Sequence, residues 1–85
     1  MSTTATVTLV TKPGCHLCDA AREVVVAVVA GNAGATFVEK SILDDAELYE
    51  RFVEDIPVVL INDRVHNIWR VDADRLRGAL LEVTA

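Results

Sequence analysis

The only two cysteines of this chain, Cys15 and Cys18, are separated by His16 and Leu17. They follow an apolar, strand-like run and precede a long helix-like run. The thiolate is the reactive form of cysteine, and the free backbone N–H groups and macrodipole at a helix start favour an anion. The motif therefore predicts reversible disulfide chemistry, with Cys15 at the helix start as the attacking thiol.

Two other interpretations of these cysteines stay open. A Cys-x-x-Cys pair can form half of a zinc site, but four-coordinate zinc needs two further ligands. His16 and His66 are the only imidazoles, and His16 is constrained beside its cysteines, so no metal site within one chain is expected. The cysteines can also be inert, and a cluster bridged between two chains is a separate alternative.

The composition indicates one small α/β domain spanning residues 1–85, with an aliphatic core. Of the 85 residues, 52% are hydrophobic and only 5% aromatic, and the formal net charge is −5. A nucleic-acid-binding protein normally shows a basic stripe. No such stripe is visible, so no nucleic-acid partner is expected.

No targeting or membrane segment is apparent. The first six residues carry no basic region of the kind that begins a signal peptide. The longest uncharged stretch, 24–38, is interrupted by Gly31 and Gly34 and is shorter than the roughly 20 apolar residues that span a bilayer. We therefore expect a cytoplasmic protein, where a disulfide is more often catalytic or redox-sensing than structural.

Hydrophobic periodicity and turn residues predict alternating strands and helices. Asp44 with Glu47 resembles a capping box that opens a short second helix, and Asn62-Asp63 suits a hairpin turn. Asp72 or Asp74 is expected to cap the last helix. The predicted strands cover 6–10, 36–40, 58–61 and 64–68, and the first helix covers 17–30.

The predicted order is β-α-β-α-β-β-α. The first two strands are joined through a helix and should be parallel, whereas the last two form an antiparallel hairpin. Because the third strand is apolar throughout, helices must cover both faces of this four-stranded mixed sheet. Tyr49 and Phe52 of the second helix are expected in the core. Trp69 is expected as a partly buried cap over the last helix, and its place near the cysteines leaves open the alternative of a substrate platform.

With this order of elements, three segments resemble the glutaredoxin-like branch of the thioredoxin superfamily. The first is Lys12-Pro13-Gly14-Cys15-His16-Leu17-Cys18, and the second is Asp55-Ile56-Pro57-Val58. The third, 41–48, is similar to the segment that leads into the second helix of small bacterial glutaredoxin-like proteins. The resemblance covers nearly the whole chain.

The resemblance implies a role for each matching residue. Cys15 corresponds to the solvent-facing nucleophile, and Cys18 to the more sheltered resolving cysteine. Pro57 corresponds to a proline whose preceding peptide bond is cis, so that the backbone of Ile56 pairs with an extended thiol substrate. Lys12 corresponds to the basic residue that meets a glutathione carboxylate.

The chain departs from that family pattern in two places. Glutathione-using glutaredoxins carry a Gly-Gly pair before the last helix, where this chain has Trp69-Arg70-Val71-Asp72. The usual aromatic residue between the cysteines is absent, and His16 stands in that region. Arg70 still offers a cation to a substrate. We therefore expect weak glutathione binding and better reduction by a dithiol protein.

These observations predict a thiol–disulfide oxidoreductase that reduces protein or low-molecular-weight disulfides. Its catalytic residues would be Cys15 and Cys18, and its substrate contacts would come from Lys12, His16, Ile56, Pro57 and Arg70. It would act as a monomer without a resident cofactor, and either a dithiol or glutathione would reduce it. The alternative is a binding module that holds an iron–sulfur cluster or a partner through the same cysteines.

Overall fold

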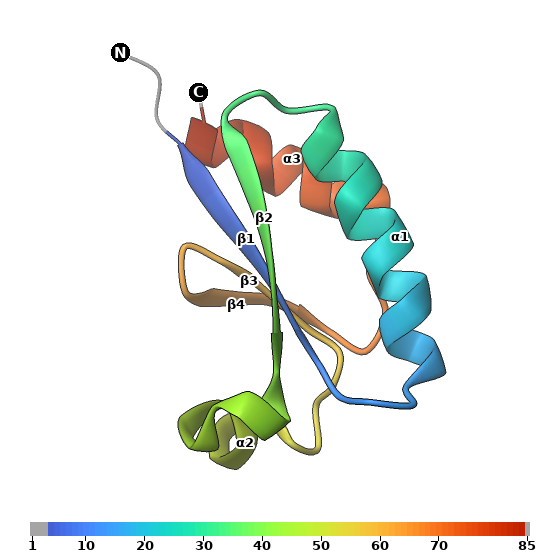
Figure 1. The fold of residues 1–85 in the computed structure, drawn as a ribbon. Helices are drawn as coiled ribbons and strands as arrows, with labels where there is room; N and C mark the ends of the chain where they lie inside the picture. Colours follow the sequence, from blue (N-terminus) through green and yellow to red (C-terminus); the bar gives the residue numbers. More distant parts are fainter. Residues whose placement is uncertain (1–3, 85) are drawn as a thin grey trace.

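A computed structural model describes residues 4–84 of the chain (Figure 1). The predicted order of strands and helices is confirmed, with one added 3-10 turn. The prediction that the chain begins without a signal peptide rests partly on residues 1–3, which lie outside the described residues. The predicted domain, 1–85, also includes Ala85, which lies outside them. The elements are β1 Ala5–Thr11, α1 His16–Ala30, β2 Ala35–Ser41, the 3-10 turn Ile42–Asp44, α2 Ala46–Phe52, β3 Val58–Ile61, β4 Arg64–Ile68 and α3 Ala73–Thr84.

The four strands form one mixed sheet in the order β2-β1-β3-β4. As predicted, β1 and β2 are parallel, with Ala5 opposite Ala35 and Thr11 opposite Ser41. β3 is antiparallel to both β1 and β4. The sheet therefore places the carboxyl end of β1, which leads to the cysteines, beside the amino end of β3, which follows Pro57.

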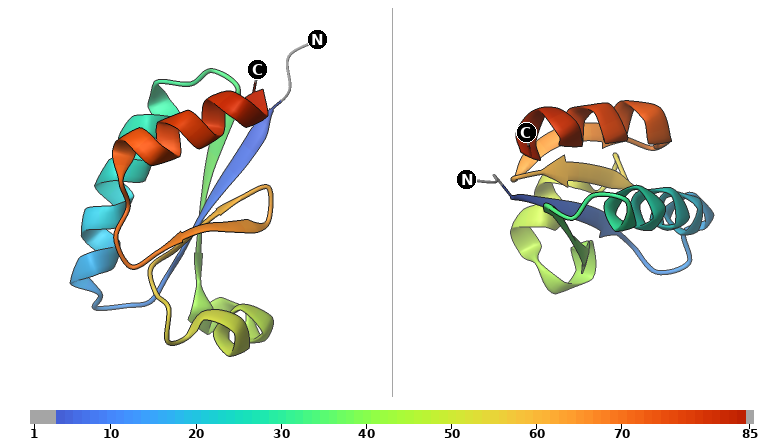
Figure 2. Two further views of the ribbon diagram at one scale, coloured as in Figure 1. Left: turned by 180° about the vertical axis from the view of Figure 1, so that it is seen from behind. Right: turned by 90° about the horizontal axis from the view of Figure 1, so that it is seen from above.

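Side chains alternate between two core layers, one on each face of the sheet. Val7 and Leu9 of β1 pack with α1 and α3, whereas Val10 packs with α2. Figures 1 and 2 show α1 and α3 side by side against the sheet, with α2 apart from them near the end of β2. Both faces of β3 are thus covered, which explains its uninterrupted apolar sequence.

Helix α1 has the face that its apolar periodicity predicts. Its buried residues, Cys18, Ala21, Val25 and Val28, are spaced three and four positions apart, as one face of a helix requires. The backbone N–H of Gly31 donates to the Val28 carbonyl and ends the helix. Cys18 is therefore part of the inward stripe of α1, within its first turn.

The predicted cap of α2 is wrong by one residue. Ser41 caps a 3-10 turn that ends at Asp44, so Asp44 lies inside this turn and not at the N-cap position of α2. The Asp45 carboxylate instead accepts hydrogen bonds from the backbone N–H groups of Glu47, at 3.0 Å, and Leu48, at 3.2 Å. A local capping pattern could not distinguish these adjacent acidic residues.

Two aromatic side chains are more exposed than predicted. Tyr49 is 47% exposed, because the short helix α2 buries only Leu48 and Phe52, which are four residues apart. The prediction that Trp69 is a partly buried cap over the last helix is also wrong. Its side chain is 53% exposed, and its indole N–H donates to the Glu54 carbonyl before β3, at 3.4 Å.

The two remaining local predictions are confirmed. Asn62 and Asp63 both have positive φ angles, of 51° and 67°, as the tight turn between β3 and β4 requires. The Asp72 carboxylate accepts a hydrogen bond from the backbone N–H of Arg75, at 3.1 Å, and caps α3. The segment between β4 and α3 is therefore short and is held at both ends.

Candidate redox centre

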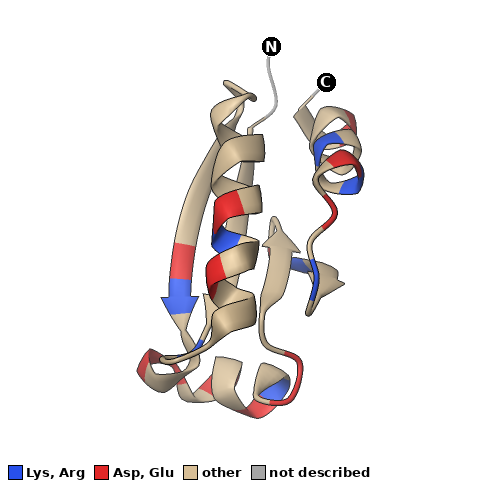
Figure 3. Cartoon of the chain, turned by 90° about the vertical axis from the view of Figure 1, so that its right-hand side faces the viewer, with Lys and Arg blue, Asp and Glu red and all other residues tan. Residues whose placement is uncertain are grey.

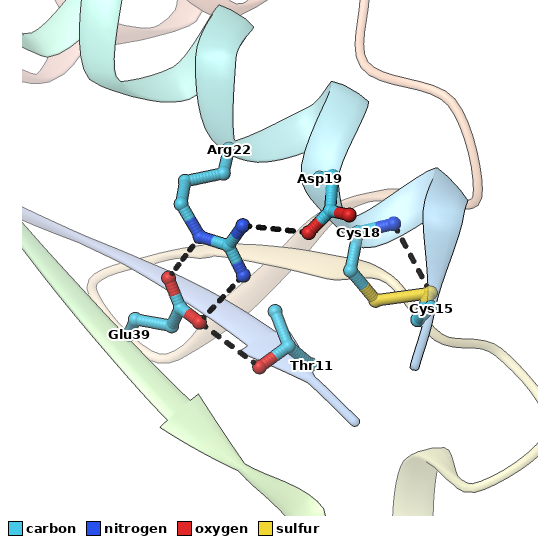
Figure 4. The surroundings of a disulfide bond; sticks show 6 residues. All are labelled: Thr11, Cys15, Cys18, Asp19, Arg22 and Glu39. Carbon is cyan, nitrogen blue, oxygen red and sulfur yellow. Dashed lines mark hydrogen bonds and ion pairs between the residues drawn. A yellow bond between two sulfur atoms is a disulfide. The ribbon is translucent and has the colours of Figure 1, made fainter. Parts of the chain in front are cut away.

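Cys15 and Cys18 are joined by a disulfide at the amino-terminal end of α1 (Figure 4). Gly14, with a φ of +71°, turns the chain from the β1 end into the helix. Cys15 has extended backbone angles and occupies the N-cap position, where its sulfur accepts a hydrogen bond from the Cys18 backbone N–H, at 3.0 Å. The same N–H group would stabilise a Cys15 thiolate after reduction, because hydrogen bonds to an ionised acceptor are stronger.

The two cysteines differ in exposure, in the order that the resemblance implied. Cys15 is half-buried, whereas Cys18 is only 1% exposed and packs in the α2-side core layer with Val10 and Ile56. A substrate can therefore reach the sulfur of Cys15 but not that of Cys18. This asymmetry suits an attacking thiol and a sheltered resolving thiol.

Ile56 and Pro57 lie in the same region. The peptide bond between them is cis, as the resemblance implied, and both side chains are buried. Ile56 belongs to the core layer against which Cys15 packs. The Pro57 carbonyl accepts a hydrogen bond from the backbone N–H of Trp69, at 2.7 Å, so the β4–α3 segment is attached directly beside the cis proline.

The three predicted cationic or titratable contacts do not form one cluster. Lys12, His16 and Arg70 are all exposed. Lys12 lines a hollow with Cys15 on the β2 side of α1, whereas Arg70 lines a different hollow between α1 and the β4–α3 segment. Within residues 4–84, neither Lys12 nor Arg70 forms an ion pair, so both remain available to a substrate.

A charged network beside the disulfide was not predicted (Figure 4). Arg22 of α1 holds the Glu39 carboxylate of β2 through two hydrogen bonds, of 2.6 and 2.9 Å, and also contacts Asp19 at 2.9 Å. The Thr11 hydroxyl donates to Glu39 at 3.2 Å. The hydrogen bonds from Arg22 lower the pKa of Glu39, to which Thr11 adds a smaller effect, and the same carboxylate raises the pKa of Arg22.

This network ties the second turn of α1 to the edge strand β2. The spacing of Asp19 and Arg22 indicates a pair on one helix face, and that part was readable from the sequence. Glu39 is 17 residues from Arg22, and only the packing of α1 across β2 brings them together. The depressed pKa of Glu39 makes it a weak proton acceptor, so the network is suited to hold the helix in place.

Charges of both signs are interspersed along α1 and α3 and at the end of β2 (Figure 3). Across residues 4–84, no group of three His, Cys, Asp or Glu side chains is arranged to hold a metal ion. None of the helices in that range is long and apolar enough to cross a bilayer.

Comparison with known proteins agrees with this geometry. Residues 6–81 match the family described as "Glutaredoxin-like domain (DUF836)". A structural genomics target protein from X. campestris is 33% identical, with a TM-score of 0.70, and the alignment covers 89% of this chain and 96% of that one. No curated protein sequence matches the chain.

Two less similar structures share the fold. A mutant thioredoxin from Halobacterium salinarum NRC-1 is 15% identical, with a TM-score of 0.74, over 98% of this chain and 77% of that one. A protein from Nitrosomonas europaea is 16% identical, with a TM-score of 0.75, over 91% and 92% of the two chains. At these identities the similarity concerns the thioredoxin-like fold alone.

Proposed function

We propose, from the premise that this chain belongs to the glutaredoxin-like domain family, that it is a dithiol thiol–disulfide oxidoreductase. The observation that carries the proposal is the asymmetric pair at the start of α1. Cys15 is accessible at the N-cap and Cys18 is 1% exposed. A reversible dithiol needs this arrangement of one thiol that attacks a substrate and one that reacts only within the protein.

The reaction has two exchange steps. The Cys15 thiolate attacks one sulfur of a substrate disulfide, which forms a mixed disulfide and releases the other substrate sulfur as a thiolate that takes a proton from water. Cys18 then loses its proton and attacks the sulfur of Cys15, which releases the second substrate thiol. Two electrons pass to the substrate, and the protein is left with its internal disulfide.

A second dithiol must return the protein to its reduced form, and we propose a protein dithiol rather than glutathione. The tripeptide would need close backbone contacts where this chain carries Trp69, Arg70 and Val71. One exposed ion pair from Lys12 contributes only about 0–1 kcal/mol, less than a lost hydrogen bond to a charged group, at about 1.5–3 kcal/mol. We further propose that the protein works as a monomer in the cytoplasm, where such reductants are present.

Steady-state reduction of bis(2-hydroxyethyl) disulfide, with dithiothreitol as the reductant, tests the proposal. We expect Cys15→Ser to abolish turnover, whereas Cys18→Ser should accumulate a mixed disulfide that mass spectrometry detects. Replacing dithiothreitol by glutathione, and then by a thioredoxin-reductase system, compares the reductants. Equal turnover by Cys15→Ser and the wild type would contradict the mechanism. Visible absorption that is lost on oxidation would instead indicate the cluster-holding alternative.

A further inference from the structure

A second hollow, of about 300 Å³, begins at Leu17, between the two cysteines in sequence. Its walls are α1 on one side and the segment between β4 and α3 on the other. Ala21 is buried and both Val24 and Val71 are partly buried, whereas Leu17 and Trp69 are about half exposed. The groove is lined by Leu17, Ala20, Ala21, Val24, Trp69, Arg70 and Val71.

Its far wall is held in an unusual backbone conformation. Trp69 has a φ of 68°, a region that bulky side chains rarely adopt. The Arg70 N–H donates to the Ile68 carbonyl at 2.9 Å, which closes a tight turn around Trp69. The Trp69 N–H and indole donate to the Pro57 and Glu54 carbonyls. Strained backbone of this kind is concentrated at functional sites.

On the basis of the proposed oxidoreductase function, we infer that this groove binds an apolar side chain of a polypeptide substrate, close to the cysteine that Cys15 attacks. Arg70 at the rim pairs with a carboxylate of the same polypeptide. The groove thereby selects protein disulfides whose cysteine is flanked by an apolar and an acidic residue.

Three features of the groove favour this occupant. Its lining is apolar except for Arg70, so burial of a hydrocarbon side chain in the groove is energetically favourable. Its volume is at the lower limit for small-molecule sites, about 300–1,000 Å³, which suits one side chain better than a whole tripeptide. Two of its lining residues are linked to the redox centre: Leu17 lies between the two cysteines in sequence, and the backbone N–H of Trp69 donates to the Pro57 carbonyl. Arg70 forms no ion pair within residues 4–84.

The test uses the full chain, reduced with dithiothreitol and then desalted. The substrates are symmetrical disulfides of the peptide acetyl-Leu-Gly-Cys-Gly-Leu-amide and of its counterpart with both leucines replaced by serine. The peptide thiol released in quenched samples is quantified by mass spectrometry and reports each reaction. Each second-order rate constant is divided by that for bis(2-hydroxyethyl) disulfide. We expect the leucine peptide to react roughly tenfold faster than the serine peptide, because burying about half of one leucine side chain has an effect of this size.

Filling the groove should remove this preference. Ala20 is exposed on α1, so Ala20→Phe fills the hollow without displacing a core residue, and the leucine preference should fall below about twofold. The matched control is Ala27→Phe. Ala27 is also exposed, two turns further along the same helix, and this variant should keep the full preference.

The pairing of Arg70 with a substrate carboxylate is tested with leucine peptides in which the two glycines beside the cysteine are replaced by glutamate or by lysine. We expect the glutamate peptide to react about threefold faster than the lysine peptide at low ionic strength, within the range of exposed ion pairs. Arg70→Glu should reverse the order, and about 1 M salt should remove it. Arg64→Glu, which changes another exposed arginine of the β4 region, should not alter it.

The outcomes separate this inference from the proposed function. A protein that reduces none of these disulfides contradicts the oxidoreductase itself. A protein that reduces the small disulfide but treats the leucine and serine peptides alike contradicts only the groove. Loss of glutathione disulfide turnover in Ala20→Phe, with no peptide preference in the wild type, would assign the groove to glutathione. Self-association that Ala20→Phe abolishes would assign it to a second copy of the chain.

Discussion

The difference between the two thiols can be measured directly by leaving one thiol at a time. Cys18→Ser retains Cys15 together with the backbone N–H of residue 18 that faces its sulfur. Cys15→Ser retains Cys18 and places serine, a good N-cap residue, at the start of α1. The two variants therefore differ mainly in which sulfur remains, and we expect the thiol of Cys15 to be alkylated faster.

The size of the effect follows from the site geometry. The N–H of residue 18 lies 3.0 Å from the sulfur of Cys15, and a hydrogen bond to a charged group contributes about 1.5–3 kcal/mol. The helix dipole adds about 0.3–1 kcal/mol. Since about 1.4 kcal/mol is a factor of ten, the thiolate population should rise by roughly 20-fold or more. Stabilising a thiolate also lowers its nucleophilicity, which cancels about half of this gain on a logarithmic scale. The net increase in the alkylation rate of Cys15 should therefore be about fivefold or more.

Exposure acts in the same direction as the charge effect. Cys18 is 1% exposed and Cys15 is half-buried, so iodoacetamide reaches Cys15 without local unfolding. Together the two effects predict that Cys15 reacts at least about tenfold faster at pH 6.

The assay is alkylation by iodoacetamide at pH 6, quenched at intervals and quantified by mass spectrometry of the intact protein. The same reaction in guanidinium chloride is the control, because unfolding removes both the helix start and the burial. There the two variants should react at similar rates. Equal rates in the folded proteins, or faster alkylation of Cys15→Ser, would show that the N-cap geometry does not activate Cys15.

Three further predictions concern stability, each measured by urea denaturation followed by circular dichroism with the disulfide intact. Glu39→Gln should destabilise the fold by about 1 kcal/mol at pH 7, after allowance for solvent screening, and more than Asp74→Asn, which breaks the more exposed pair with Arg77. The folded state lowers the pKa of Glu39 from 4.5. The stability lost in Glu39→Gln relative to the wild type should therefore be constant above about pH 5.5 and vanish as the pH falls through the folded-state pKa. A stability loss that becomes larger on acidification would contradict this prediction. Trp69→Gly should be about 0.5–1 kcal/mol more stable than Trp69→Ala, because alanine retains the cost of positive φ, and the opposite order would remove the argument for strain. Leu76→Ala should cost about 2–5 kcal/mol, because Leu76 is fully buried against α1 and the sheet, and a loss below 1 kcal/mol would contradict that packing.

Local patterns were sufficient to predict the elements and the reactive pair. The three- and four-residue spacing of the apolar positions predicted α1, and the uninterrupted apolar run predicted β3 as a strand covered on both faces. Positive φ angles at Asn62 and Asp63 are a property of the turn itself, so these residue types indicated the hairpin. Cys15 and Cys18 are three residues apart on one helical turn, and their relation is therefore local as well.

Local patterns failed where two adjacent positions satisfied the same rule. Asp44 and Asp45 are both acceptable caps, and the preceding 3-10 turn decided between them. Tyr49 is apolar enough for a core, but so short a helix buries only Leu48 and Phe52, and Tyr49 is left exposed. In each case the backbone path before the helix, which no local pattern specifies, determined the outcome.

The sequence by itself therefore determined the order of elements, the parallel pairing of the first two strands, the hairpin of the last two and the identity of the two disulfide-forming cysteines, because these depend on periodicity and short spacing. The tertiary structure alone decided which distant residues surround them. It paired Arg22 with Glu39 across α1 and β2, and it placed Trp69 and Arg70 opposite Leu17 to form a groove. Such contacts depend on the angle and register at which a helix crosses the sheet, and these are set by packing over the whole core.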